Sequence, residues 1–217
     1  MVMAANSGGY LFHYWAGLYG GCAHIYAPGG QRGPFAHLPY GIDNGAFAAF
    51  DAVREWDEAA FRKLLDWTEA AAIAPLWVAA PDVVTDAKAT LDRWDGWAAE
   101  IRERGLPAAL VVQDGMTPAD VRACEPDAVF VGGSTEWKWL WMYRFCDSHP
   151  RVHVGRVNGY RPLLRCYDAG VESCDGTGWF RGDQVQVEGL RRFLHEQSED
   201  RVPSPTPLFA GSDDAGQ

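Results

Sequence analysis

Short apolar runs alternate with longer amphipathic segments along most of this 217-residue chain. Apolar runs bounded by turn residues predict buried strands, and apolar residues at helical spacing predict helices between them. The expected strands are 38–42, 75–80, 108–112, 128–131, 152–157 and, more weakly marked, 169–174. The expected helices are 56–72, 86–104, 118–124, 135–148, 160–169 and 184–197. Strand–helix alternation of this kind is typical of an α/β protein with a parallel sheet.

The number of strands favours a compact (β/α)8-type barrel, with a doubly wound sheet as the alternative. The Gly-rich first 35 residues are expected to supply one or two further strands, and GYLFHYW at 9–15 is a candidate. We expect a single domain over residues 1–197. Residues 198–217 are rich in Pro, Ser, Asp and Gly, so a flexible C-terminal tail is predicted there.

Composition excludes several classes of protein. No apolar run approaches the roughly 18 residues of a membrane helix, so no membrane partner is expected. The N-terminus lacks the basic and apolar regions of a secretory signal. Five scattered cysteines without a CxxC motif indicate a reducing cytoplasm and count against a disulfide scaffold. If a phage encodes the chain, that cytoplasm is the host's.

Charge and motif content limit the ligands. The net charge of −10 counts against non-specific binding of polyanions. Between Arg144 and Arg192, however, the sequence contains eight arginines and six acidic residues, so a local basic surface is compatible with the acidic chain. No phosphate-binding loop or dinucleotide fingerprint follows a predicted strand, so no cofactor is expected. The histidines show no metal-ligand spacing and are expected at packing or surface positions; they are His13, His24, His37, His149, His153 and His195.

Polar residues gather where the apolar runs end. The segments concerned are Asp43-Asn44-Gly45, Pro81-Asp82, Gln113-Asp114-Gly115, Gly132-Gly133-Ser134-Thr135, Gly155-Arg156 and Asp175-Gly176-Thr177-Gly178. The carboxyl ends of parallel strands surround one mouth, so the carboxylates of Asp43, Asp82 and Asp175, the amide of Gln113 and the exposed glycine backbone should converge on one pocket. Several of the segments are also ordinary turn sequences. The prediction therefore depends on all six strand ends together.

Such a pocket suits a planar heterocycle. A carboxylate can accept two hydrogen bonds from the adjacent ring N–H and exocyclic NH2 of guanine. An amide can bind a carbonyl or ring nitrogen, and an aromatic side chain such as Phe47 can stack on the ring. A second carboxylate is then free to attack a sugar C1′, and a third can transfer a proton.

The order of these motifs resembles the tRNA-guanine transglycosylase superfamily, and most closely its short phage and bacterial members implicated in placing 7-deazaguanines in DNA. The resemblance spans about Gly41 to Arg181. It implies exchange of guanine in a polynucleotide for a 7-deazaguanine through a covalent sugar–Asp intermediate. The implied catalytic residues are Asp175 as nucleophile and Asp43 for proton transfer. The implied substrate-binding residues are Phe47, Asp82, Gln113, Gly132, Gly133, Val154 and Gly155.

Departures from the family refine this expectation. The family's zinc ligands follow the nucleophile, but no cysteine follows Cys174, so no zinc subdomain and no metal are predicted. The chain is much shorter than the tRNA enzymes, which favours DNA over tRNA as the partner, together with free guanine and 7-deazaguanine. Arg156, Arg161 and Arg181 are expected to bind phosphates.

Two other functions stay open. Asp43 and Asp175 could cleave an N-glycosidic bond with water as the acceptor. Alternatively, the chain could be a noncatalytic nucleic-acid-binding accessory subunit with a degenerate pocket. Most of its ten tryptophans suit core or interface packing better than base stacking. A homo-oligomer formed through such an aromatic surface is compatible with the sequence.

Overall fold

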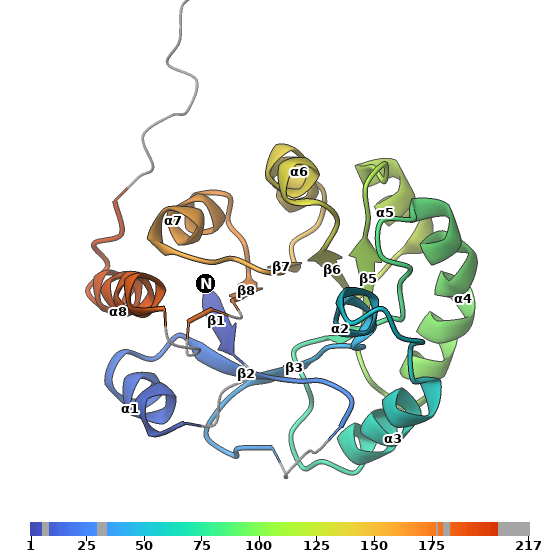
Figure 1. Ribbon diagram of the computed structural model, residues 1–217, viewed down its shortest axis with the longest axis horizontal. Coiled ribbons are helices and arrows are strands. Elements are labelled where there is room, and N and C mark those ends of the chain that lie inside the picture. The colour runs from blue at the N-terminus through green and yellow to red at the C-terminus, as the bar shows by residue number, and fades with distance from the viewer. Residues whose placement is uncertain (6–8, 30–33, 177, 180–182, 204–217) are drawn as a thin grey trace, which may run out of the picture.

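The computed structural model describes residues 1–5, 9–29, 34–176, 178–179 and 183–203. Its parallel strands close into a barrel in sequence order, and helices surround them (Figure 1). The strands are β1 (Val2–Ala5), β2 (Cys22–Tyr26), β3 (Tyr40–Ile42), β4 (Val78–Ala79), β5 (Ala108–Val112), β6 (Ala128–Val131), β7 (Val152–Val154) and β8 (Ser173–Asp175). The barrel closes where β1 pairs with β8, with Ala4 opposite Asp175. The predicted (β/α)8-type barrel is confirmed, and the doubly wound alternative is wrong.

From residue 56 onward the helices follow the expected segments closely. They are α1 (Tyr10–Tyr19), α2 (Ala46–Asp51), α3 (Glu58–Glu69), α4 (Ala87–Glu103), α5 (Pro118–Cys124), α6 (Thr135–Ser148), α7 (Tyr160–Asp168) and α8 (Gln184–Ser198). Helix α2 is additional to the predicted set and lies inside the ring of the other helices (Figure 1). None of the helices in the described ranges has the length and apolar character needed to cross a membrane. The predicted tail follows α8, and its residues 204–217 lie outside the described residues.

One prediction near the N-terminus is wrong. The segment GYLFHYW at 9–15 forms most of α1 and no strand. Its buried positions, Phe12 and Trp15, are three residues apart, which is the spacing of one helix face. The strands of this region are β1 and β2, on either side of α1.

Side chains cap the N-termini of α3, α4, α5, α6 and α8. Asp57 accepts a hydrogen bond from the amide of Ala60 at the start of α3, and Asp86 does the same for Ala89 at the start of α4. The Thr-Pro pair predicts the start of α5, and there Thr117 forms a capping box with Asp120. Each cap satisfies a backbone amide that the helix leaves unpaired. The residue at which each preceding loop ends and its helix begins is therefore fixed.

Strand alternation separates two apolar layers. In β5, Ala108, Leu110 and Val112 pack against the helices, whereas Ala109 and Val111 point into the barrel. Trp77 fills the lower interior and is only 1% exposed. A Cβ on Gly41 would lie 2.4 Å from Trp77 Cζ2, so glycine is required beside this ring. Side chains therefore fill the barrel interior below the carboxyl ends of its strands.

Candidate functional site

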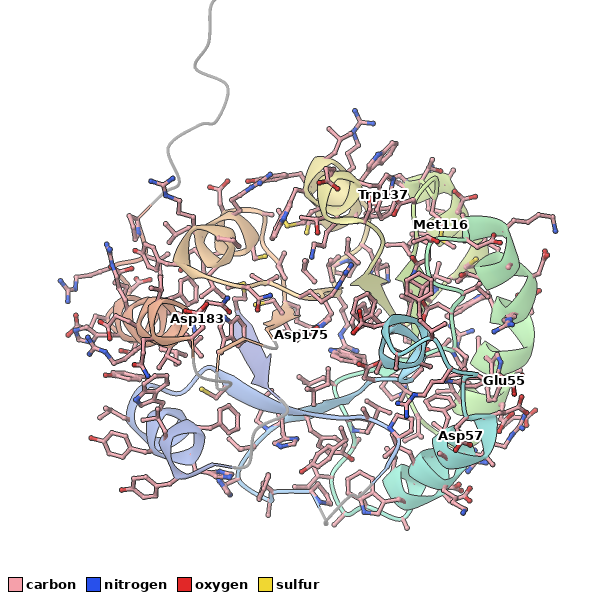
Figure 2. The ribbon with its side chains drawn as sticks, viewed as in Figure 1. Glu55, Asp57, Met116, Trp137, Asp175 and Asp183 are labelled. Atoms are coloured by element: carbon pink, nitrogen blue, oxygen red, sulfur yellow. The ribbon has the colours of Figure 1, made fainter. Side chains whose placement is uncertain are left out.

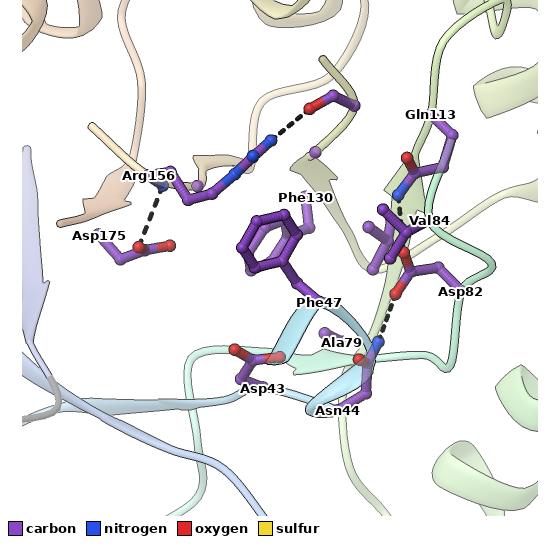
Figure 3. Close-up of a pocket in the computed structure, with 14 residues that line it drawn as sticks. Asp43, Asn44, Phe47, Ala79, Asp82, Val84, Gln113, Phe130, Arg156 and Asp175 are labelled. Carbon is purple, nitrogen blue, oxygen red and sulfur yellow. Dashed lines mark hydrogen bonds between the residues drawn. The ribbon is translucent and has the colours of Figure 1, made fainter. Parts of the chain in front are cut away.

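A cavity of about 100 Å³ lies at the carboxyl ends of the strands (Figure 3). Its walls come from loops and strand ends that are far apart in the sequence. The lining residues are Asp43, Asn44, Phe47, Ala79, Asp82, Val84, Val111, Gln113, Phe130, Gly132, Gly133, Gly155, Arg156 and Asp175. Figure 2 shows Asp175 inside the ring of helices, whereas the capping residues Asp57 and Asp183 lie at helix starts. The structure thus brings most of the predicted site residues to one place.

Asp82 is held by two side-chain amides. Its Oδ1 accepts a hydrogen bond from Asn44 Nδ2 at 2.8 Å, and its Oδ2 accepts one from Gln113 Nε2 at 2.7 Å. Burial raises the pKa of Asp82 above its usual value, while these two donors oppose the rise. Each oxygen retains a second lone pair, so the carboxylate can still accept hydrogen bonds from a ligand.

The partners of Asp82 are themselves fixed. Asn44 Nδ2 also donates to the carbonyl of Ala80 at 2.8 Å, and the amide of Thr85 donates to Gln113 Oε1 at 3.0 Å. These bonds set which way each side-chain amide faces. Asn44 was not among the predicted site residues, although it stands directly after Asp43. Asn44, Asp82 and Gln113 form one polar wall (Figure 3).

Asp43 has an environment that suits proton transfer. Its backbone amide donates to the carbonyl of Tyr26 at 2.7 Å, and its Oδ1 accepts from the amide of Gly45 at 2.9 Å. Burial, together with the negative charges of Asp175 and Asp82, raises the pKa of Asp43 to about 6. Both protonation states are therefore accessible near neutral pH, as general acid–base catalysis requires.

Asp175 accepts hydrogen bonds on both oxygens. The backbone amide of Arg156 donates to Oδ1 at 3.1 Å, and His153 Nε2 lies 3.1 Å from Oδ2. Arg156 has a φ of 58°, in the left-handed region, and in this conformation its amide reaches Asp175. His153 was expected at a packing or surface position. It is buried, but it also contacts the predicted nucleophile.

The Gly132-Gly133 segment permits a close approach of backbone to the cavity. A Cβ on Gly133 would lie 2.4 Å from Asp114 Oδ1, and the residue has a φ of 68°. Asp114 in turn accepts hydrogen bonds from the amide and the hydroxyl of Ser134, both at 2.6 Å. The loops after β5 and β6 are therefore tied together beside the cavity.

Arg156 covers the predicted stacking residue. Its guanidinium carbon lies 4.4 Å from the centre of the Phe47 ring, and its NH2 group donates to the carbonyl of Gly133. The Phe47 side chain comes from α2, and the residue is 41% exposed. The guanidinium thus contacts both Phe47 and the glycine segment, and Figure 3 shows the Arg156 side chain beside the Phe47 ring.

Lys138 binds the backbone of the loop after β7 from the helix layer. This buried side chain of α6 donates to the carbonyl of Gly155 at 2.6 Å and to that of Arg156 at 3.3 Å. Burial and the charge of Arg156 lower the pKa of Lys138 to about 8. Sequence reasoning missed Lys138. It stands four residues before Met142 and seven before Phe145, on the buried face of α6.

Two predicted residues stand apart from the cavity, and a third lies outside the described residues. Val154 is wrong as a lining residue, because strand alternation turns it toward the helix layer, whereas Gly155 does line the cavity. Arg161 is exposed on α7 and does not line the cavity either. Arg181 lies outside the described residues. Within the ranges that the structure describes, no group of three His, Cys, Asp or Glu side chains could hold a metal ion.

Fold and site together define a (β/α)8 barrel with three carboxylates around a cavity at the carboxyl ends of its strands. No family model matches the chain, and no curated protein matches it.

Solved structures provide a likeness of fold. A chain of the tryptophan synthase α2β2 complex from the hyperthermophile Pyrococcus furiosus is 13% identical, with a TM-score of 0.54 over 93% of this chain and 97% of that chain. A chain of tryptophan synthase from M. tuberculosis, in an aminoacrylate- and BRD0059-bound form, is 13% identical, with a TM-score of 0.48 over 94% and 92%. The first likeness supports the barrel and carries nothing about the substrate.

Proposed function

We propose that this chain is an enzyme that exchanges guanine in a polynucleotide, DNA rather than tRNA, for a 7-deazaguanine. The observation that carries the proposal is the meeting of Asp43, Asp82 and Asp175 around one cavity, with Gln113 and the Gly132-Gly133 segment beside them. These residues have the chemistry that base recognition, nucleophilic attack and proton transfer each require.

The polar wall of Asn44, Asp82 and Gln113 recognises the base. The free lone pairs of Asp82 accept hydrogen bonds from the ring N–H and the exocyclic NH2 of guanine, which are adjacent donors on one edge. Gln113 and the backbone of Gly132-Gly133 bind the remaining polar atoms of the base. Phe47 stacks on the ring once Arg156 has moved away from it. The nucleotide must leave the helical stack to reach this depth.

The exchange then proceeds in two half-reactions. A carboxylate oxygen of Asp175 attacks C1′ as the bond from C1′ to guanine N9 breaks, and the bonding electron pair leaves with the base. Asp43 gives its proton to the departing guanine. In the second half-reaction, Asp43 takes the N9 proton of the incoming 7-deazaguanine. That nitrogen attacks C1′, and the ester to Asp175 breaks. A group whose pKa is about 6 can both give and accept this proton.

The experiment mixes the purified protein with guanine-containing DNA and labelled 7-cyano-7-deazaguanine, with tRNA in a parallel arm. Label entering DNA, and a denaturation-stable protein–DNA adduct without incoming base, support the proposal. Both should disappear in Asp175→Ala and persist in Asp147→Ala, an exposed aspartate outside the cavity. Release of free guanine without incorporation would instead indicate a hydrolase. DNA binding without release or incorporation would indicate an accessory subunit. Incorporation into tRNA alone would overturn the choice of DNA.

A further inference from the structure

A chain of buried polar groups leads from the barrel interior to Asp175. His153 Nε2 lies 3.1 Å from Asp175 Oδ2, and His153 Nδ1 lies 2.8 Å from Ser173 Oγ. Trp77 Nε1 donates to the same hydroxyl at 3.3 Å. Strand alternation places Ser173 and Asp175 on the inner face of β8, and β7 pairs with β8 so that His153 lies opposite Ser173. We propose that His153 is the positioning residue for the nucleophile, a role that rests on the proposed function.

The direction of each hydrogen bond follows from the donors present. The Trp77 indole can only donate, so Ser173 Oγ accepts from it. The Asp175 carboxylate can only accept, which assigns a hydrogen to His153 Nε2. In the neutral ring Nδ1 is then the acceptor, and the Ser173 hydroxyl donates to it. His153 Nε2 donates its hydrogen to Asp175 Oδ2. The opposite tautomer would place a nitrogen lone pair against a carboxylate oxygen.

This arrangement fixes the rotation of the Asp175 carboxylate. The side-chain torsion of an aspartate next to its carboxylate is broad, so a carboxylate held at one oxygen can still turn. Asp175 is held at both, since the Arg156 amide binds Oδ1 and His153 binds Oδ2. Attack on C1′ requires an oxygen at the correct angle, and a misplacement of about 1 Å can cost about 10²-fold in rate. The His153 side chain is 0% exposed, so it acts through Asp175 rather than on the substrate.

Packing alone does not account for histidine at this position. The ring lies between Trp77 and Phe130, with centroid distances of 4.3 and 4.5 Å. A phenylalanine would suit that apolar contact. A buried imidazole requires partners for both nitrogens, and the structure provides them at Ser173 and Asp175.

The first test reads the tautomer and needs no turnover. Two-bond ¹⁵N–¹H NMR spectra of histidine-labelled protein are recorded on the full chain, with the signals of His153 assigned by their loss in His153→Gln. We expect a protonated Nε2 and an unprotonated Nδ1 in the wild type, and a mixture of tautomers in Asp175→Ala. A protonated Nδ1 in the wild type, or signals that Asp175→Ala leaves unchanged, would overturn the proposal. Because this test is independent of activity, it separates the proposal from the function it rests on.

The second test compares two replacements of His153 in single-turnover formation of the sugar–protein adduct. His153→Phe keeps the ring but removes the donor, and we expect adduct formation at saturating DNA to slow by about 30- to 100-fold with an unchanged KM for DNA. In His153→Gln, the amide nitrogen can replace Nε2, so most of the rate should return. His195→Gln, which changes an exposed histidine on α8, is the control. Equal losses in both variants, or a loss confined to KM, would show that the role of His153 is structural.

Discussion

The guanidinium carbon of Arg156 lies 4.4 Å from the centre of the Phe47 ring, and both side chains line the cavity. The same guanidinium donates a hydrogen bond to the carbonyl of Gly133. The Arg156 side chain therefore covers one face of Phe47 at the cavity. Under the proposed function, a base that stacks on Phe47 must displace this cation, which is then free to bind a phosphate of the polynucleotide.

Replacing Arg156 should therefore affect the two ligands in opposite directions. In Arg156→Asn, which tolerates the left-handed backbone, affinity for free guanine should rise by about 3- to 10-fold, because no cation–π contact has to be broken. Affinity for DNA should fall, and the salt dependence of binding should decrease by about one phosphate contact. Isothermal titration with guanine and with a DNA oligonucleotide checks both effects. Arg156→Lys should retain the salt dependence without the planar stacking. Unchanged guanine affinity in both variants would contradict this account.

Asp43 should make stability depend on pH in the acidic range. Its pKa in the folded protein is about 6 against an ordinary value of 3.8, so the folded state binds the proton more tightly. The resulting penalty on folding is present in full above about pH 6 and is absent below about pH 4. Asp43→Asn keeps an oxygen for the Gly45 amide and should raise the free energy of unfolding by about 1–2 kcal/mol at pH 7.5, after allowance for partial exposure.

Urea unfolding of both proteins at pH 7.5 and pH 4 checks this prediction. The two curves should converge at the lower pH. Base exchange by Asp43→Asn should meanwhile fall by about 10²- to 10⁴-fold, because the amide cannot transfer the proton. A stability difference that is the same at both values of pH would show that Asp43 does not titrate as described.

Asp82 should determine which purine is bound. In Asp82→Asn, one acceptor becomes a donor and faces the N–H groups of guanine, so guanine affinity should fall by about 10²-fold. Xanthine presents a carbonyl where guanine has its NH2 group, so Asp82→Asn should reduce the affinity for xanthine less than the affinity for guanine. Competition binding with the two bases checks the ratio. The existing donors from Asn44 and Gln113 will also be disturbed, so thermal unfolding of the variant is the necessary control. Equal losses for both bases would count against base reading by Asp82.

Lys138 should make the free energy of unfolding rise with pH in the alkaline range, whereas Asp43 makes it fall with pH in the acidic range. Its pKa is lowered from 10.5 to about 8, so between these values the unfolded chain binds more protons than the folded one. The contribution of Lys138 to stability therefore rises with pH over that window, by about 2–3 kcal/mol. Lys138→Met lacks this rise and also leaves the carbonyls of Gly155 and Arg156 without their donor. The difference in unfolding free energy between the two proteins should widen from pH 8 to pH 10. A constant difference would mean that the ammonium is not penalised by burial.

The barrel could be predicted because strands β3–β8 and helices α3–α8 each have a local signature. The run at 108–112 became β5 without a shift, and Thr117-Pro118 marked the start of α5. The convergence of the carboxylates followed from topology alone, since the ends of parallel strands share one face. The N-terminal region failed because aromatic residues favour strands in general, whereas Phe12 and Trp15 pack on one helical face.

The contacts within the site could not be predicted in the same way. The pairing of His153 with Asp175 depends on the register between β7 and β8, which places His153 opposite Ser173. Lys138 reaches its carbonyls from the helix layer, across 17 and 18 residues of sequence. Neither relation leaves a local pattern, because the partners belong to separate elements whose distance is set by packing.

The closed interior below the cavity also has a kinetic consequence. Trp77 and its neighbours fill the barrel beneath the site, so the described residues offer a free base no passage through the core. Departing guanine and arriving 7-deazaguanine would then share one opening and compete for one contact surface. Under the proposed function, exchange should follow a ping-pong order, with the first product gone before the second substrate binds. Parallel lines in double-reciprocal plots would be its signature.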